Sequence, residues 1–269
     1  MSNNYIIIGD GYLSNNTNYI EITDGYNSSA SNYLIFGQGG NYIPPTPPST
    51  FLPTDISGLA LWLRSDLGIS LNGSTVSEWA DQSGNLANAL QGNASLQPAY
   101  SSSGGPNGVP YLSWTAAGNS VALAATLTVN QPSEYFIVCR NLNSGGNFVR
   151  LIDCGVNDLQ TYVDNTQQVN MYSGADFATG NSLTLSADSI VDNIFNGASS
   201  QSAVNGGTLA TGNAGASNGN GTVTIGNSGG GGGSWVGRIY EVIVYNQTLT
   251  SDQRILINTY LSNRYNITI

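Results

Sequence analysis

Short β-prone runs separated by clusters of Gly, Asn and Ser dominate the sequence from Asp55 to its end. Runs of this kind, each bounded by turn residues, indicate strands, and many of them in close succession indicate an antiparallel all-β domain. We therefore expect residues 55–269 to form one antiparallel β-sandwich, a length that can bury a sizeable core. The expected strands are 60–64, 111–114, 121–124, 135–140, 148–154, 160–163, 182–186, 189–196, 201–204, 222–225 and 234–245.

The last of these strands is apolar on both of its alternating faces, which predicts a central position with cover on each side. Strict alternation puts Glu241 on the same face as Ile239 and Ile243. A carboxylate on such a face is more often held by an Arg or by backbone donors than used in catalysis.

One amphipathic helix is expected after this strand. Thr250 and Gln253 have the spacing of a capping box at its start. Its apolar stripe, which should dock on the sheet, consists of Ile257, Tyr260, Leu261 and Tyr265.

Residue types that the chain lacks exclude several kinds of chemistry. The sequence has no His, and its six cations are all Arg. Without His there can be no Ser-His-Asp or Cys-His pair and no zinc site that depends on imidazole. Without Lys there can be no Walker A loop and no Schiff base. If the chain is a catalyst, its catalytic groups are therefore expected to be Asp and Glu carboxylates.

The charge balance excludes two classes of partner. Charged residues make up 8% of the chain and the net charge is −10, so the basic surface that nucleic acid or an anionic membrane requires is absent. The apolar run Ile6–Ile8 is too short for a signal peptide or a membrane span, which predicts synthesis in a cytoplasm without export by a leader.

The two cysteines, Cys139 and Cys154, each lie in an apolar run. If residues 143–146 turn these runs into a hairpin, Cys139 lies opposite Arg150, and a disulfide is geometrically disfavoured. We expect two buried thiols, since a free Cys behaves as a small hydrophobe.

Three 14-residue units open the chain, starting at Asn4, Asn18 and Asn32. Strands this short do not hold together alone in water, so residues 1–43 should pair with copies of themselves or with another protein, rather than form a disordered or self-contained tail. Residues 44–54 are Pro-rich and predict a stiff linker or an extended strand into the next domain. The expected contact residues of the repeats are Tyr5, Ile7, Tyr19, Ile20, Ile22, Tyr33 and Ile35.

Four segments in order, residues 56–66, 76–85, 107–112 and 237–245, resemble the concanavalin A-like (laminin G-like) jelly-roll domains. The resemblance implies an all-β jelly-roll β-sandwich with a C-terminal helix, preceded here by the N-terminal β-repeat anchor. Domains of that family serve as lectins, adhesins, structural modules and glucanases, so the fold alone does not give the function.

The N-terminal units similarly look like short repeats at the start of some tailed-phage virion proteins. This resemblance implies a homotrimeric structural protein at the virion surface, made in the host cytoplasm. Its role would be capsid decoration, cement or head fibre, with the repeats bound to major capsid or tail proteins. The alternative is a tail-fibre adhesin for a host surface glycan. For that alternative the candidate glycan-binding residues are Tyr162, Asn165, Tyr172 and Asn227, an aromatic and amide set suited to sugars.

Catalysis and metal binding are the remaining possibilities. Glucanases of this fold carry Glu-x-Asp-x-(x)-Glu on one strand, and no such run occurs here, so we expect the chain not to be an enzyme. Calcium is the one cofactor considered, with candidate ligands Asp81, Asp153 and Asp158 in expected loops. For Asp81, a structural Asx turn is the favoured alternative.

Overall fold

The structure, a computed structural model, describes residues 51–115, 121–145, 148–155, 158–228 and 233–269. The predicted anchor and its contact residues, Tyr5, Ile7, Tyr19, Ile20, Ile22, Tyr33 and Ile35, lie outside the described residues. The last residues of the predicted linker belong to the folded part: the Phe51 ring lies against Tyr260, and the Tyr245 hydroxyl donates to the Pro53 carbonyl at 2.7 Å.

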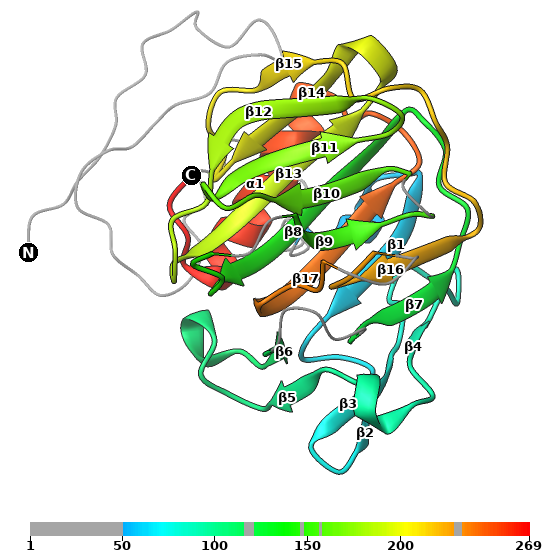
Figure 1. Ribbon diagram of the computed structural model, residues 1–269, viewed down its shortest axis with the longest axis vertical. Helices are drawn as coiled ribbons and strands as arrows, with labels where there is room; N and C mark the ends of the chain where they lie inside the picture. The colour runs from blue at the N-terminus through cyan, green and yellow to red at the C-terminus, as the bar shows by residue number, and fades with distance from the viewer. Residues whose placement is uncertain (1–50, 116–120, 146–147, 156–157, 229–232) are drawn as a thin grey trace, which may run out of the picture. The chain divides into compact units, whose positions relative to one another are not determined.

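The described part is almost entirely antiparallel β structure (Figure 1), which confirms the all-β prediction. Its single α-helix is α1 (Ser251–Tyr265), and its short 3₁₀-helices are Pro53–Asp55, Ala94–Leu96, Pro106–Gly108 and Gly197–Ser199. The strands are β1 (Leu59–Arg64), β2 (Ile69–Asn72), β3 (Thr75–Trp79), β4 (Ala89–Leu90), β5 (Ala99–Ser101), β6 (Tyr111–Trp114), β7 (Leu123–Thr126), β8 (Ser133–Asn141), β9 (Val149–Asp153), β10 (Gln160–Val163), β11 (Gln168–Tyr172), β12 (Asp176–Ser182), β13 (Asp188–Phe195), β14 (Ser200–Val204), β15 (Ala210–Gly212), β16 (Thr222–Ile225) and β17 (Gly237–Tyr245).

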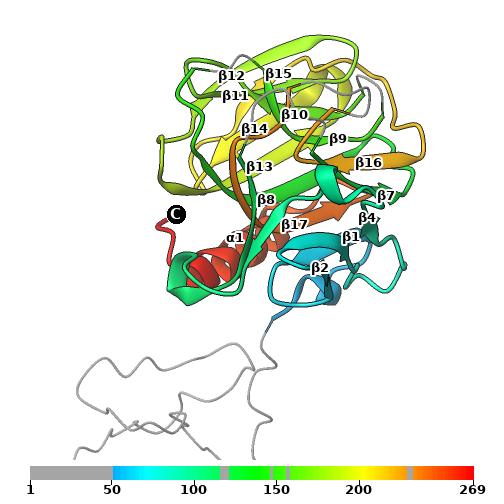
Figure 2. The ribbon, with the colours of Figure 1, turned by 60° about the horizontal axis from the view of Figure 1, so that its bottom comes forward.

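The strands form two facing layers and the helix forms a third (Figures 1 and 2). The back layer has the order β14, β13, β8, β17 and β1, and the front layer has the order β12, β11, β10, β9, β16 and β7. Helix α1 covers the side of the back layer that faces away from the front layer.

The jelly-roll prediction is not confirmed at this level of detail. Strand β6 pairs with β17 in the back layer, and the ladder continues through β5, β3 and β4 to β7 in the front layer. The two layers are therefore one sheet that bends round and nearly closes, as in a barrel, instead of two separate sheets.

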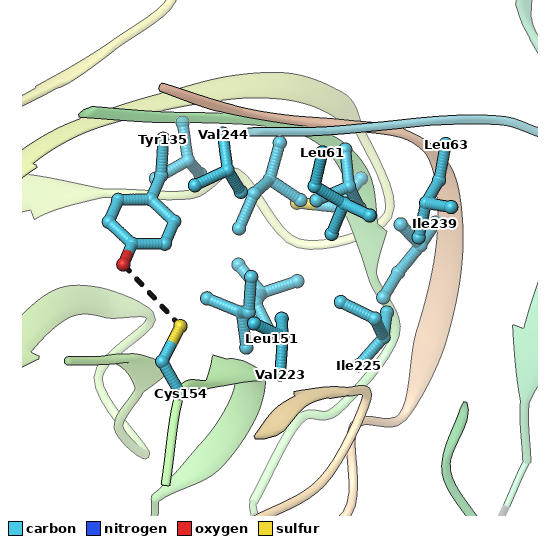
Figure 3. Packing of buried hydrophobic residues seen from close by; sticks show 14 of the residues in the cluster. Leu61, Leu63, Tyr135, Leu151, Cys154, Val223, Ile225, Ile239 and Val244 are labelled. Atoms are coloured by element: carbon cyan, nitrogen blue, oxygen red, sulfur yellow. Dashed lines mark hydrogen bonds between the residues drawn. The ribbon is translucent and has the colours of Figure 1, made fainter. Parts of the chain in front are cut away.

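Apolar side chains of the two layers meet between them and form the main core (Figure 3). The Tyr135 hydroxyl lies 3.4 Å from the Cys154 sulfur inside this cluster. Residues that contribute from the back layer include Leu61, Leu63, Ile239 and Val244, and those from the front layer include Leu151, Val223 and Ile225.

Both cysteines are buried free thiols, as predicted, and burial raises the pKa of Cys154 to about 12. The predicted hairpin between them is wrong. Strand β8 is paired on its two edges with β13 and β17, so β9 has no free edge of β8 to join and lies in the opposite layer. The expected strand 182–186 is also wrong, because β12 ends at Ser182 and Ala187 N–H closes a turn onto Thr184 O.

Strand β17 is central, as predicted. It pairs with β8 along one edge and with β6 and β1 along the other. A bulge between Ile239 and Glu241 breaks the alternation, so Ile239 packs between the layers whereas Glu241 faces helix α1. The expectation that these two residues share a face is therefore wrong, and a bulged residue is the physical reason.

Helix α1 begins at the predicted capping box. Thr250 Oγ1 accepts from Gln253 N–H at 3.2 Å, and the Gln253 side chain accepts from Thr250 N–H at 3.0 Å. Ile257, Leu261 and Tyr265 are buried against the back layer, which confirms the predicted stripe. In the part of the chain that the structure describes, no helix has the length and apolarity needed to cross a membrane.

Replacing Leu261 with Ala should destabilise the fold by about 2–5 kcal/mol, because it leaves a cavity between the helix and the back layer. Ile255→Ala is the matched control: Ile255 is on the same helix and 60% exposed, so its loss should change stability by at most about 0.5 kcal/mol. Chemical denaturation measures both values. Equal effects would contradict the docking of this stripe.

Candidate functional site

The front layer presents one face to the core, and its opposite face is only partly open to solvent. On that face Asp176 is exposed and Arg150 and Tyr172 are partly exposed, whereas Gln160, Tyr162 and Asn170 are buried. Along β10, β11 and β12, Val163, Val169, Met171 and Phe177 point into the main core. Residues that alternate with them point outward. We call this outward surface of β9–β12 the front face, and it carries Arg150, Gln160, Tyr162, Asn170, Tyr172 and Asp176.

Strand register places these outward residues beside one another. Tyr162 lies opposite Asn170 on one side and opposite Arg150 on the other. Tyr172 lies opposite Gln160 and Asp176. Directly opposed side chains on one face are close neighbours, so two tyrosines, two amides, one guanidinium and one carboxylate form a continuous surface.

Aromatic rings give the front face an apolar part. Phe148 directly precedes β9, and the centroid of its ring lies 5.5 Å from that of the Tyr162 ring, with an interplanar angle of 54°. Phe148 is 52% exposed, whereas Tyr162 is 6% exposed beneath its neighbours. The Tyr162 hydroxyl donates to Asp176 Oδ1 at 2.9 Å. Burial and this hydrogen bond raise the pKa of Tyr162, so the hydroxyl stays protonated.

The turn between β10 and β11 is held by Asp164. Its Oδ1 accepts from Thr166 N–H at 2.8 Å and from Gln168 N–H at 3.0 Å, and its Oδ2 accepts from the Asn170 side chain at 3.3 Å. Burial alone would raise the pKa of Asp164, but these hydrogen bonds outweigh it and lower the pKa. The turn therefore holds Asn165 exposed at the end of the front face.

Of the four residues predicted to bind glycan, Tyr162 and Tyr172 share the front face, and Asn165 borders it. Asn227 does not belong to this surface. It is 1% exposed, its amide donates to Ser234 Oγ at 3.1 Å, and its Oδ1 accepts from Ser228 N–H at 2.7 Å. The side chain of Asn227 therefore has a structural role, because its hydrogen bonds join Ser228 and Ser234 to it.

Five residues of the front face and its border were not predicted from the sequence: Phe148, Arg150, Gln160, Asn170 and Asp176. Two of them could have been found, because Gln160-x-Tyr162 and Asn170-x-Tyr172 repeat an amide and an aromatic at alternate positions. Asp176 starts a strand that the sequence pattern did not predict.

The three candidate calcium ligands come from different elements. Asp81 accepts from Trp62 N–H and Ser83 N–H through Oδ1, each at 2.9 Å, and from Ala87 N–H through Oδ2 at 3.1 Å. The hydrogen bond from Ser83 N–H to Asp81 Oδ1 forms the Asx turn that the sequence favoured. Asp153 ends β9 and accepts from the Gln160 amide at 3.1 Å, and Asp158 offers its backbone carbonyl to Cys154 N–H. Among the described residues, no group of three or more acidic or Cys side chains is placed to hold a metal ion.

Glu241, considered as a catalytic candidate, is fully buried and surrounded by donors. Trp62 Nε1 and the Tyr260 hydroxyl donate to Oε1 at 2.6 and 2.9 Å, and the Tyr265 hydroxyl donates to Oε2 at 2.7 Å. Arg264 Nε lies 3.3 Å from Oε2. Burial raises the pKa of Glu241 in spite of these donors. The side chain joins α1 to the back layer, which agrees with the structural role expected for it.

Glu134 and Asp192 form a second buried acidic pair beneath α1. Arg254 Nε lies 2.7 Å from Glu134 Oε1 and 3.5 Å from Asp192 Oδ2, and Leu249 N–H donates to Glu134 Oε2 at 2.7 Å. Burial is the main cause that raises the pKa of Asp192, and the neighbouring Glu134 raises it further. This pair faces the helix and is remote from the front face.

Comparisons with known proteins show a shared fold. No family model and no curated protein matches the chain. Among solved structures, a Trypanosoma rangeli sialidase matches with a TM-score of 0.53 and 19% identity over 78% of this chain. The match covers 33% of the sialidase, so the chain spans about a third of that protein's length.

Two further structures match on a larger share of their own length. Domain 4 of the extracellular GH43 arabinanase of Geobacillus stearothermophilus, solved in complex with arabinotriose, matches at a TM-score of 0.50 and 13% identity, over 72% of this chain and 95% of that domain. The binding domain of Paraclostridial mosquitocidal protein 1 matches at a TM-score of 0.53 and 14% identity, over 78% of this chain and 53% of that one.

These matches correct the expectation that the chain is not an enzyme. That expectation rested on the missing Glu-x-Asp-x-(x)-Glu run, yet about a third of a chain solved as a sialidase and one domain of an arabinanase share the fold. Carboxylates for hydrolysis can come from different strands, which a motif confined to one strand does not detect. The missing run therefore does not separate this chain from glycoside hydrolases.

Asp192→Asn should raise the melting midpoint at pH 7 by a few degrees, because it removes the cost of a buried charge. Folding raises the pKa of Asp192 above its usual 3.8, so wild-type stability falls as the pH rises from about 4 through the raised pKa. The advantage of the variant should accordingly shrink as the pH is lowered towards 4.

The matched control is Asp66→Asn. Burial of Asp66 is outweighed by Arg264 and Arg64, which lower its pKa, so this variant should lower the midpoint at pH 7. Calorimetry between pH 4 and pH 8 measures both variants. A lower midpoint for Asp192→Asn at pH 7 would show that its carboxylate stabilises the fold.

Proposed function

We propose that residues 51–269 form a glycan-binding domain and that the front face is its binding surface. The observation that carries the proposal is one outward surface with two accessible aromatic rings, the partly exposed Tyr172 and the half-exposed Phe148, with amide and carboxylate neighbours. Sugar rings stack their C–H faces on aromatic rings, and their hydroxyls pair with amides and carboxylates. The back layer has no comparable outward surface beneath α1, because the helix covers it.

The structural comparisons support this proposal by the ligands that they contain. The arabinanase domain was solved with arabinotriose, and a T. rangeli sialidase that matches at a TM-score of 0.52 and 20% identity was solved with sialic acid. Both ligands are carbohydrates, and the arabinanase domain is matched over nearly its whole length.

Tyr172→Ala should weaken binding to a glycan by about 10-fold or more, because a stacking platform is removed while the core remains intact. Tyr111→Ala is the matched control, since Tyr111 is a partly exposed tyrosine on β6, away from the front face. A glycan array followed by calorimetry on the best ligand measures both variants, and the same incubations are read for released sugar. Equal affinities for the two variants would remove the front face from the binding site.

We further propose that the N-terminal repeats attach this domain to a larger assembly, in a virion, where it is displayed towards a host surface glycan. The 14-residue periodicity of residues 4–39 favours attachment, because each unit contains one short β-prone run, and strands of that length are not stable alone. Added strands bind through main-chain hydrogen bonds, with alternate side chains in pockets of the partner.

Deletion of residues 1–43 should abolish incorporation into particles while leaving the melting midpoint of the remaining domain unchanged. Particle purification with immunodetection of the protein measures incorporation, and calorimetry measures the fold. Particles that retain the truncated protein would refute the anchoring role.

A further inference from the structure

Arg150 differs from most other arginines of the chain in lacking an acidic partner. Arg64, Arg140, Arg254 and Arg264 each form a salt bridge with Asp or Glu. In the described residues, Arg150 forms none, although the chain carries 16 acidic residues against six cations. Arg238 also lacks one, but its guanidinium lies over the Tyr111 ring, with the Cζ atom 4.1 Å from the centroid.

The guanidinium of Arg150 is held in place without being neutralised. Its Nε donates to Gln160 Oε1 at 3.3 Å and its Nη1 donates to the Phe148 carbonyl at 3.0 Å. Gly233 provides the space for it, because a Cβ at that position would collide with Nη1 and with the Phe148 carbonyl. Gly233 also has φ +71°, which L side chains rarely adopt. The guanidinium of Arg150 is therefore held in one position by Gln160, by the Phe148 carbonyl and by the space that Gly233 leaves.

Within the described ranges, some donors of this guanidinium have no acceptor. Arginine has five N–H groups, and the two hydrogen bonds to Gln160 and Phe148 use two of them. The side chain is partly exposed on the front face, opposite Tyr162, and the Tyr162 ring contacts the exposed Phe148 ring. An arginine fork beside an aromatic platform fits a sugar ring that carries a carboxylate.

The acidic groups of the front face restrict where such a carboxylate binds. Asp164 is occupied in its turn and its pKa is lowered, and Asp176 accepts from the Tyr162 hydroxyl. Both repel a second anion, so only the Arg150 end of the surface attracts one. We propose that Arg150 selects an acidic glycan by binding the carboxylate of a sugar residue whose ring lies on Phe148. This inference rests on the proposed glycan-binding function.

The test uses the full-length protein and an array of oligosaccharides that contain galacturonic, glucuronic, mannuronic or sialic acid. Each is printed beside its carboxyl-reduced, neutral counterpart. At least one acidic member should bind about 10-fold or more tightly than its neutral counterpart, the size expected for a hydrogen-bonded charge pair. The preference is a property of the wild type, so this arm does not depend on whether a variant folds.

Arg150→Gln should then remove the preference, so that the acidic member and its neutral counterpart bind this variant with affinities equal within about twofold. Arg238→Gln, the matched control at the other arginine without an acidic partner, should keep the preference. If neutral and acidic members bind equally, or if Arg150→Gln retains the preference, the inference is wrong while the glycan-binding function stands. If no member of the array binds, both are overturned.

Discussion

Strand β17 must be covered on both faces, and the rest of the structure depends on that requirement. Its residues are apolar on both sides, and a bulge turns Glu241 towards one of them. The front layer covers one side and α1 covers the other. Because Glu241 is buried under the helix, Trp62, Tyr260 and Tyr265 must all donate to it, which ties the start and the end of the domain to the central strand.

This arrangement leaves the outward face of the front layer without a covering helix. Its inward residues complete the core, whereas on the outward side Arg150 and Tyr172 are partly exposed and Asp176 is exposed. The outward residues of β9–β12 are aromatic and amide-rich, and Phe148 is half exposed. The inward residues of these strands thus stabilise the core, and their outward residues form the proposed binding surface. Antiparallel sheets commonly have one packed and one solvated face.

Local patterns predicted the elements that depend on local physics. Strands 111–114, 160–163 and 222–225 have the predicted bounds, and the capping box placed the start of α1. Pairing is non-local, so the hairpin of the two cysteines and the location of Asn227 could not be predicted in the same way. Strand β12 is rich in small residues and lacks a β-prone pattern, so neither the strand nor the position of Asp176 on it was predicted. Tyr162 and Tyr172 were found singly, whereas the surface that they form depends on the register of three strands.

The most direct test of the account is a crystal structure of the full-length protein with an oligosaccharide that it binds in solution. Sugar density is expected on the front face, with a ring against Phe148 or Tyr172 and a polar group of the sugar within hydrogen-bonding distance of Arg150 or Asp176. Density at the helix side, or at the loops around Asp81, with the front face empty, would contradict it.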